Sequence, residues 1–276
     1  MRWTPGGRSP NLEDRRSMGG GMGRGLGIGG TVVVLALSLL FGRNLFNDLG
    51  VEPGVAATEA PMSTADSAAE ETEVQFISFV LDDVQKTWAG ILPNYGARFH
   101  PARLVLFRSS TDSGCGLAES VMGPFYCPLD ERVYLDLGFF DELKQRFGAS
   151  GDFAQAYVLA HELGHHVQHL LGTDSRVRQL QESNPSDASQ LSVRLELQAD
   201  CYAGVWAHST DQRRLLQQGD VDEALNAASA VGDDRIQRRT TGRINVDSFT
   251  HGSAAQRSEW FKRGFESGDP RSCSTL

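Results

Sequence analysis

The pattern of hydrophobic and polar positions divides the chain into a short N-terminal part and a long folded part. Residues 26–42 carry no charge and are mostly apolar, and they follow a Gly- and Arg-rich stretch at 1–25. Residues 43–72 have the small, polar composition of a linker. Regular apolar patterning starts near residue 73. We therefore expect a cytoplasmic tail (1–25), a transmembrane anchor (26–42), a flexible linker (43–72) and one folded domain (73–276).

Within the domain, the spacing of apolar residues predicts an α+β fold that is mainly helical. Short apolar runs predict strands at 104–107 and 132–136, joined by a long loop. Residues 174–187 are expected to form a polar connection. Helical spacing is found at 73–90, 139–147, 152–171, 189–207, 220–238 and 253–264. We expect a small antiparallel or mixed sheet packed on a helical core.

The uncharged segment at 26–42 is short for a membrane span, which needs about 20 apolar residues. A cleaved signal peptide is the main alternative, but no small-residue cleavage pattern follows the apolar run. A buried core helix is a second alternative. The preceding stretch is rich in Arg, which favours the cytoplasmic side. We expect a single-pass anchor in the bacterial inner membrane, with the domain on the periplasmic or extracellular side.

Charge and cysteine content refine this picture. The 276 residues carry a net charge of −9, and an acidic chain argues against nucleic-acid binding. Four cysteines fit an oxidising compartment, and none of them shows the C-x-x-C spacing of a zinc site. Cys115 and Cys127 bracket a Gly-containing loop and could close a short disulfide, which would leave Cys201 and Cys273 as a second pair. Four cysteines allow three connectivities, so the pairing stays open.

The candidate chemistry is concentrated in the helix expected at 152–171. His161 and His165 are four residues apart, so both imidazoles lie on one helix face and can share a Zn²⁺ ion. Glu162 lies at the flank of that face, where a carboxylate can act as general base toward a zinc-activated water. The surrounding residues are apolar, and burying these groups without partners costs several kcal/mol. The alternative is a pair of structural core histidines without metal.

The nearby histidines do not supply a third ligand. His169 lies about 12 Å along the helix axis from His161, which is too far for one ion to bind both. His166 points about 100° away from His165. We expect His166 and His169 either to pack in the core or to support the ligand residues, without binding the metal.

A second helix offers carboxylates instead. Glu196 and Asp200 share one face of the helix expected at 189–207, in Ala- and Trp-containing surroundings that indicate burial. Two buried carboxylates need a cation, so we expect Glu196 to bind zinc. Asp200 would accept the ring N–H of a ligand histidine, a contact that fixes the tautomer. The alternative is a surface helix with a salt bridge to Arg194.

These motifs together resemble a known family. The H-E-x-x-H motif with a downstream E-x-x-x-D helix resembles the gluzincin arrangement of thermolysin-like peptidases. More closely, about residues 70–273 resemble the bacterial putative neutral zinc metallopeptidase family. The matching segments are Tyr126-Cys127-Pro128, VYLD at 133–136, HELGHHVQ at 161–168, ELQADCYAGVWA at 196–207 and FTHGSAAQR at 249–257. The resemblance implies a zincin-like fold and a single zinc, with His161, His165 and Glu196 as ligands and Glu162 as base.

The sequence therefore predicts a membrane-anchored zinc metallopeptidase that hydrolyses peptide bonds of a peptide or protein substrate. His251 is a candidate transition-state stabiliser, and the favoured alternative is a turn that caps the last helix. Residues 133–135 are a candidate edge strand for substrate binding. One alternative is a non-catalytic envelope scaffold or binding protein that zinc stabilises. Another is a hydrolase that acts on a non-peptide envelope component.

Overall fold

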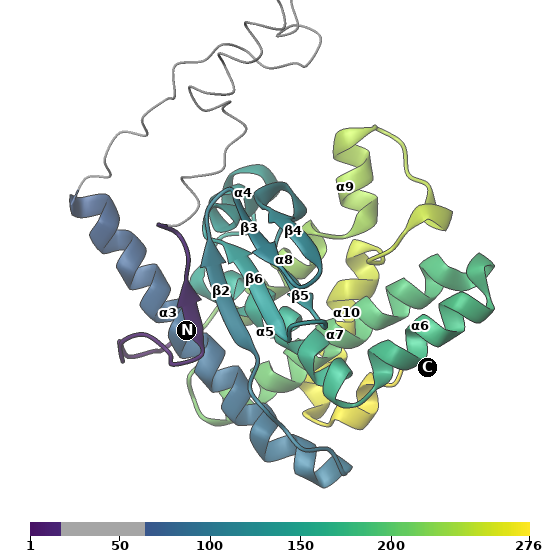
Figure 1. Cartoon of the computed structure of the whole chain (residues 1–276), viewed down its shortest axis with the longest axis horizontal. Coiled ribbons are helices and arrows are strands. Elements are labelled where there is room, and N and C mark those ends of the chain that lie inside the picture. Colours follow the sequence, from purple (N-terminus) through teal and green to yellow (C-terminus); the bar gives the residue numbers. More distant parts are fainter. Residues whose placement is uncertain (18–63) are drawn as a thin grey trace, which may run out of the picture.

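A computed structural model of the chain describes residues 1–17 and 64–276 (Figure 1). The fold is α+β and mostly helical, as expected from the sequence. In chain order the strands and α-helices are β1 (Leu12–Asp14), α3 (Thr64–Ile91), β2 (Arg103–Phe107), β3 (Ser110–Ser113), β4 (Gly116–Glu119), β5 (Phe125–Cys127), β6 (Arg132–Asp136), α4 (Gly138–Phe147), α5 (Asp152–Leu170), α6 (Thr173–Ser183), α7 (Ala188–Gln212), α8 (Asp220–Ala230), α9 (Asp233–Thr240) and α10 (Ala254–Ser267). The short 3-10 helices are η2 (Leu92–Tyr95), η3 (Ser120–Met122), η4 (Pro185–Asp187), η5 (Val246–Ser248) and η6 (Pro270–Cys273).

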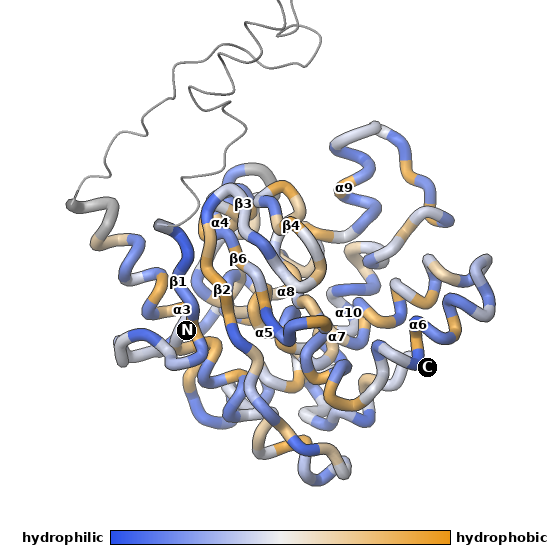
Figure 2. The backbone as a smooth tube through the Cα atoms, in the orientation of Figure 1, coloured by the Kyte–Doolittle hydropathy of each residue, from blue (hydrophilic) through white to orange (hydrophobic). Residues whose placement is uncertain are grey.

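The main sheet has the strand order β1-β2-β6-β5. The β1–β2 and β2–β6 pairs are parallel and the β5–β6 pair is antiparallel, so the expected mixed sheet is confirmed. Side chains alternate between its faces. Leu104 and Leu135 belong to the large core shared with the helices, whereas Phe107 and Tyr134 belong to a small cluster that includes Ala118 of β4. Figure 2 shows the hydrophobic stretches of β2 and β6 at the middle of the molecule.

The helices pack around α5, which contacts α3, α7 and α8. In Figure 1, α3 runs along one side of the sheet while α6, α7, α9 and α10 are grouped on the other. Helix α10 packs closely on α7, and glycines make this possible. A Cβ added to Gly204 would lie 2.1 Å from the carbonyl oxygen of Phe261, and one added to Gly264 would lie 1.9 Å from that of Cys201. Any side chain at these positions would force the two backbones apart.

Residues 1–17, which we expected to form a separate tail, are part of the folded domain. Strand β1 pairs with β2, with Leu12 opposite Leu104. The ring of Trp3 lies 5.4 Å from that of Phe76 on α3. The described residues 1–17 and 64–276 therefore form one body. A single membrane crossing at 26–42 would put these two parts on opposite sides of the bilayer, so that topology and this packing cannot both hold in one molecule.

The membrane segment itself, residues 26–42, lies outside the described residues, as does most of the expected linker. Among the described helices, none is both long and apolar enough to cross a membrane.

Several expected elements differ in the structure. The prediction of a polar connection at 174–187 is wrong, because most of this segment is helix α6, which packs on α7. The helix buries few apolar side chains, Val177 among them, so its sequence has little apolar periodicity. The single helix expected at 220–238 is divided at Gly232, where an added Cβ would lie 2.3 Å from the backbone nitrogen of Ala254. The long loop before β6 carries the β3–β4 hairpin and β5.

Both candidate disulfides are present. Cys115 is bonded to Cys127, and Cys201 is bonded to Cys273. The first joins the β3–β4 hairpin to β5, and the second joins η6 to helix α7.

Candidate metal centre

Two helices supply the candidate metal ligands. Helix α5 carries His161, Glu162 and His165, and helix α7 carries Glu196. The helices approach closely at Gly164, where an added Cβ would lie 3.0 Å from the carbonyl oxygen of Ala199. The small residue inside the H-E-x-x-H motif therefore allows the side chains of the two helices to meet.

The structure brings the three predicted zinc ligands together. His161 Nε2 lies 3.2 Å from Glu196 Oε2, and His165 Nε2 lies 3.4 Å from Glu196 Oε1. One donor atom from each residue lies within 4.8 Å of the other two. Two imidazole nitrogens and a carboxylate oxygen form a donor set typical of zinc. The residues present therefore fit a zinc ion.

The described residues contain one other group of this kind, formed by Asp152, Asp220 and Glu223. It contains only carboxylates. The amino group of Met1 lies 2.6 Å from Asp152 Oδ1 and 3.3 Å from Asp220 Oδ1, so a cationic group already pairs with two of the three carboxylates.

Asp200 lies directly behind the ligand His161. It is fully buried and accepts hydrogen bonds from the Tyr157 hydroxyl (2.5 Å) and from His161 Nδ1 (2.8 Å). The buried guanidinium of Arg257, on α10, donates to both carboxylate oxygens of Asp200 at 2.8 and 2.9 Å. With Nδ1 bonded to Asp200, His161 directs Nε2 toward Glu196. Asp200 therefore contacts a ring nitrogen of a candidate ligand histidine, and its role in metal binding stays a prediction.

The electrostatics of the cluster couple the two histidines to the carboxylates. Burial lowers the pKa of His161, but the carboxylates of Asp200 and Glu196 outweigh it and raise the pKa to about 10. Burial raises the pKa of Glu196, but the two histidines outweigh it and hold the pKa well below its usual value. Without a metal, the protonated histidines and the ionised carboxylates therefore pair with one another where the ring nitrogens meet. Burial also raises the pKa of Glu162, as suits a group that must gain and lose a proton.

The cluster faces a cleft of about 900 Å³. Glu162 lines this cleft together with His161, His165 and Glu196. Residues 133–135 do form a strand, β6, but the prediction that it lies at the edge of the sheet is wrong. Strand β6 has hydrogen-bonded neighbours on both sides. Strand β5 is the outer strand next to the cleft, and its Phe125 and Tyr126 form part of the cleft wall.

His251 lines the same cleft, on the loop before α10. Its Nδ1 lies 3.2 Å from Asp233 Oδ1, and this contact raises its pKa. Backbone N–H groups of Thr250, His251 and Gly252 all donate to Asp233 Oδ2, at 2.7 to 3.0 Å. A separate capping box formed by Ser253 and Gln256 begins α10. The loop is thus held by Asp233, and His251 is not the capping residue.

His166 and His169 lie outside the cluster. His166 is buried and its Nε2 donates to the carbonyl of His100, so its Nδ1 accepts from the Tyr126 hydroxyl. Burial lowers the pKa of His166 to about 4. His169 contacts Asp174 at 2.9 Å. Of the two roles expected for these histidines, the contacts agree with packing.

Sequence reasoning missed four residues that contact the site: Tyr157, Gln168, Asp233 and Arg257. Tyr157 precedes His161 by four positions and Gln168 follows His165 by three, so helical spacing carried a signal for both. Arg257 comes from 96 residues away in the chain, and Asp233 contacts only the loop of His251. No local pattern could have assigned these two.

Comparison with known proteins places these observations in a family. A family model described as "Putative neutral zinc metallopeptidase" matches residues 1–276. "Uncharacterized protein YpfJ" of Escherichia coli K12 is 46% identical over 284 residues, which cover 100% of this chain and 99% of the relative. "Uncharacterized protein Rv2575" of Mycobacterium tuberculosis H37Rv is 44% identical over 253 residues, which cover 83% of this chain and 84% of the relative. No solved structure matches the chain.

Proposed function

The chain belongs to the putative neutral zinc metallopeptidase family, and from this premise we propose that it is a zinc-dependent enzyme that hydrolyses peptide bonds. The observation that carries the proposal is the convergence of His161, His165 and Glu196 beside a cleft that Glu162 also lines. Zinc held by these three residues would supply a positive charge that acidifies water and polarises a carbonyl group.

The protein's own residues account for the proton transfers. Glu162 is a buried carboxylate in the cleft, and it would take a proton from the attacking water and deliver it to the leaving amine. Its raised pKa helps it to hold that proton between the two steps. Asp200 and Arg257 keep His161 in the tautomer that presents Nε2 to the metal.

We assign the stabilisation of the developing oxyanion to His251. Its ring borders the cleft, and its Nδ1 contact with Asp233 raises its pKa and so favours the protonated ring, in which Nε2–H is a second donor. Because Asp233 also accepts three backbone N–H groups of this loop, the ring is held in place before substrate binds.

The substrate we propose is an extended polypeptide with apolar side chains. Strand β5 ends the sheet beside the cleft, so a substrate strand could pair with its outer edge. Val121 and Met122 line the cleft and are 88% and 59% exposed, and Phe139 and Val158 add further apolar wall. Such a wall favours a bulky apolar substrate residue near the scissile bond.

We propose that the apolar residues 26–42 attach the protein to the bacterial inner membrane, with the domain on the periplasmic or extracellular side. The two disulfides support an oxidising compartment. The packing of residues 1–17 on the domain adds the condition that both lie on the same side of the membrane. Equal labelling of single cysteines placed at Arg8 and Lys262 by an impermeant reagent on intact cells supports this; labelling at Lys262 alone contradicts it.

The proposal is tested by Glu162→Gln in the full-length protein. We expect the variant to keep its zinc while its hydrolysis of a quenched fluorescent protein substrate falls by about 10²–10⁴-fold, the usual contribution of a general base. Glu182→Gln, at an exposed position on α6, is the matched control and should behave like wild type. Undiminished hydrolysis by Glu162→Gln would exclude the mechanism. Zinc binding without any hydrolysis by wild type would favour the non-catalytic scaffold.

A further inference from the structure

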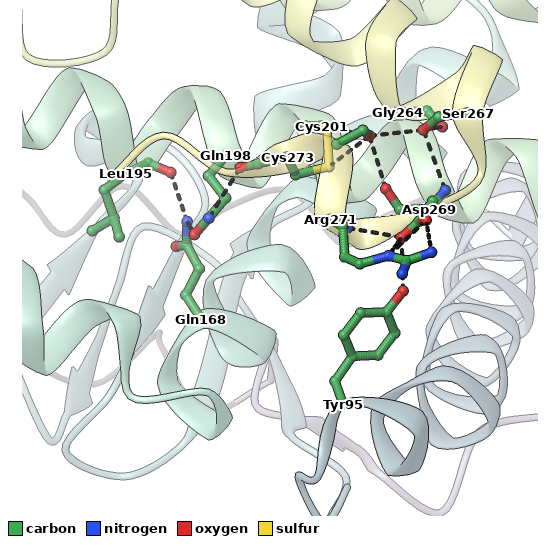
Figure 3. The surroundings of a disulfide bond; sticks show 11 residues. Tyr95, Gln168, Leu195, Gln198, Cys201, Gly264, Ser267, Asp269, Arg271 and Cys273 are labelled. Atoms are coloured by element: carbon green, nitrogen blue, oxygen red, sulfur yellow. Dashed lines mark hydrogen bonds and ion pairs between the residues drawn. A yellow bond between two sulfur atoms is a disulfide. The ribbon is translucent and has the colours of Figure 1, made fainter.

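A chain of buried amide side chains connects the ligand His165 to the C-terminal disulfide. His165 Nδ1 lies 2.8 Å from Gln168 Oε1. Gln168 Nε2 donates to the carbonyl of Leu195 at 2.7 Å and to Gln198 Oε1 at 3.1 Å. Gln198 Nε2 in turn donates to the carbonyl of Cys273 at 3.0 Å. Figure 3 shows this path from Gln168 to the Cys201–Cys273 disulfide.

Two backbone carbonyls fix the direction of every hydrogen bond in the chain. A carbonyl oxygen only accepts, so the NH₂ group of Gln198 must face Cys273 and its oxygen must face Gln168. For the same reason the NH₂ group of Gln168 faces Leu195 and its oxygen faces His165. His165 must then carry its proton on Nδ1. When the ring is neutral, its Nε2 is the lone-pair nitrogen, on the side where Glu196 lies.

The two ligand histidines are therefore oriented in different ways. His161 is oriented by the charged Asp200, which Arg257 and Tyr157 hold. His165 is oriented by a neutral amide. Gln168 is fully buried, so losing one of its partners would leave a buried polar group unsatisfied, at a cost of about 1–3 kcal/mol.

The acceptor at the far end of the chain depends on the disulfide. Cys273 lies in η6, and its covalent bond to Cys201 on α7 holds it there. Segment η6 also packs on α7 and α10, whereas its hydrogen bond from the Tyr95 hydroxyl to Asp269 at 2.7 Å is exposed. Exposed polar contacts of this kind contribute little. The disulfide is the covalent constraint on the position of the Cys273 carbonyl, in addition to the packing of η6 on the two helices.

We infer that Gln168 is the positioning residue for His165, and that Gln198 and the Cys201–Cys273 disulfide set its alignment, so that zinc affinity depends on this disulfide. The inference rests on the zinc site of the proposed function. It assigns a role in metal binding to a cross-link that none of the three ligands contacts through its own side chain.

The experiment compares zinc dissociation constants of full-length variants by competition with a chromophoric chelator. We expect Gln168→Met to weaken binding by about 10–100-fold, the usual effect of losing a partner of a ligand histidine. Gln198→Met and the double variant Cys201→Ser/Cys273→Ser should each weaken it by about tenfold, the lower end of that range. All three should also change the visible absorption of the Co²⁺-substituted protein, because the ligand geometry changes. A loss of stability alone would not do so.

The chain offers two matched controls. Cys115→Ser/Cys127→Ser removes the other disulfide, and Gln212→Met replaces an exposed glutamine on the same helix as Gln198. Both should keep wild-type zinc affinity. If the Cys201→Ser/Cys273→Ser protein does not fold, Gln198→Met tests the same link with both disulfides intact. Equal weakening by the two disulfide variants, or unchanged affinity in Gln168→Met or Gln198→Met, overturns the inference.

The outcomes also separate this inference from the proposed function. Wild-type protein that binds no zinc overturns both. Wild-type protein that binds zinc and hydrolyses peptides, while every variant keeps its affinity, overturns the inference alone.

Discussion

Replacing Arg257 with Met should strongly destabilise the domain, because it removes one partner of a buried ion pair. The side chain of Arg257 is 4% exposed and that of Asp200 is 0% exposed. Breaking such a pair on one side leaves an uncompensated buried charge, which costs about 3–5 kcal/mol. A domain of this size loses about 2–4 °C of melting temperature per kcal/mol, so we expect a decrease of about 6–20 °C.

The assay is urea and thermal unfolding of the full-length protein in the presence of a chelator, so that bound metal does not contribute. Lys262→Met, at an exposed position on the same helix, is the control and should change stability by less than about 0.5 kcal/mol. The double variant Arg257→Met/Asp200→Asn removes both charges, so it should cost less than the sum of the two single changes. A cost below about 1 kcal/mol for Arg257→Met, or strict additivity in the double variant, would refute the reasoning.

Two further predictions concern packing and can be measured in the same unfolding experiments. Gly204→Ala should destabilise the protein by at least about 1–3 kcal/mol, because the added methyl would lie 2.1 Å from a backbone oxygen of α10. The control is Gly90→Ala, because an added Cβ at that position meets nothing within 4 Å. A neutral Gly204→Ala would show that α7 and α10 are not so close. Trp3→Ala should cost about 2 kcal/mol, because its ring packs on Phe76, and unchanged stability would mean that residues 1–17 are not docked.

Much of the candidate site could be predicted from the sequence, because its signals are local. Helical spacing alone placed His161 and His165 on one face, and the buried pair Glu196 and Asp200 on another helix. The structure brings these residues together as expected. The sequence did not reveal that Arg257 is the cation paired with Asp200. This ion pair forms only when α10 packs on α7.

The parts of the fold that were missed depend on partners that are distant in sequence. Residues 1–17 have the composition of a tail, yet β1 forms because β2 offers its unpaired edge. Helix α6 has few apolar positions, so its pattern resembled a loop, and its packing on α7 decides its structure. Strand β5 is only three residues long, and no periodicity can be read from so short a segment.

The central claim is that His161, His165 and Glu196 hold one zinc ion. The most direct test is metal analysis of the purified full-length protein, with wild type compared with Glu196→Ala and with the exposed control Glu182→Ala. The account predicts one zinc per chain in wild type and in the control, and zinc lost or much weakened in Glu196→Ala. Zinc bound equally well by Glu196→Ala, or absent from wild type, would contradict it.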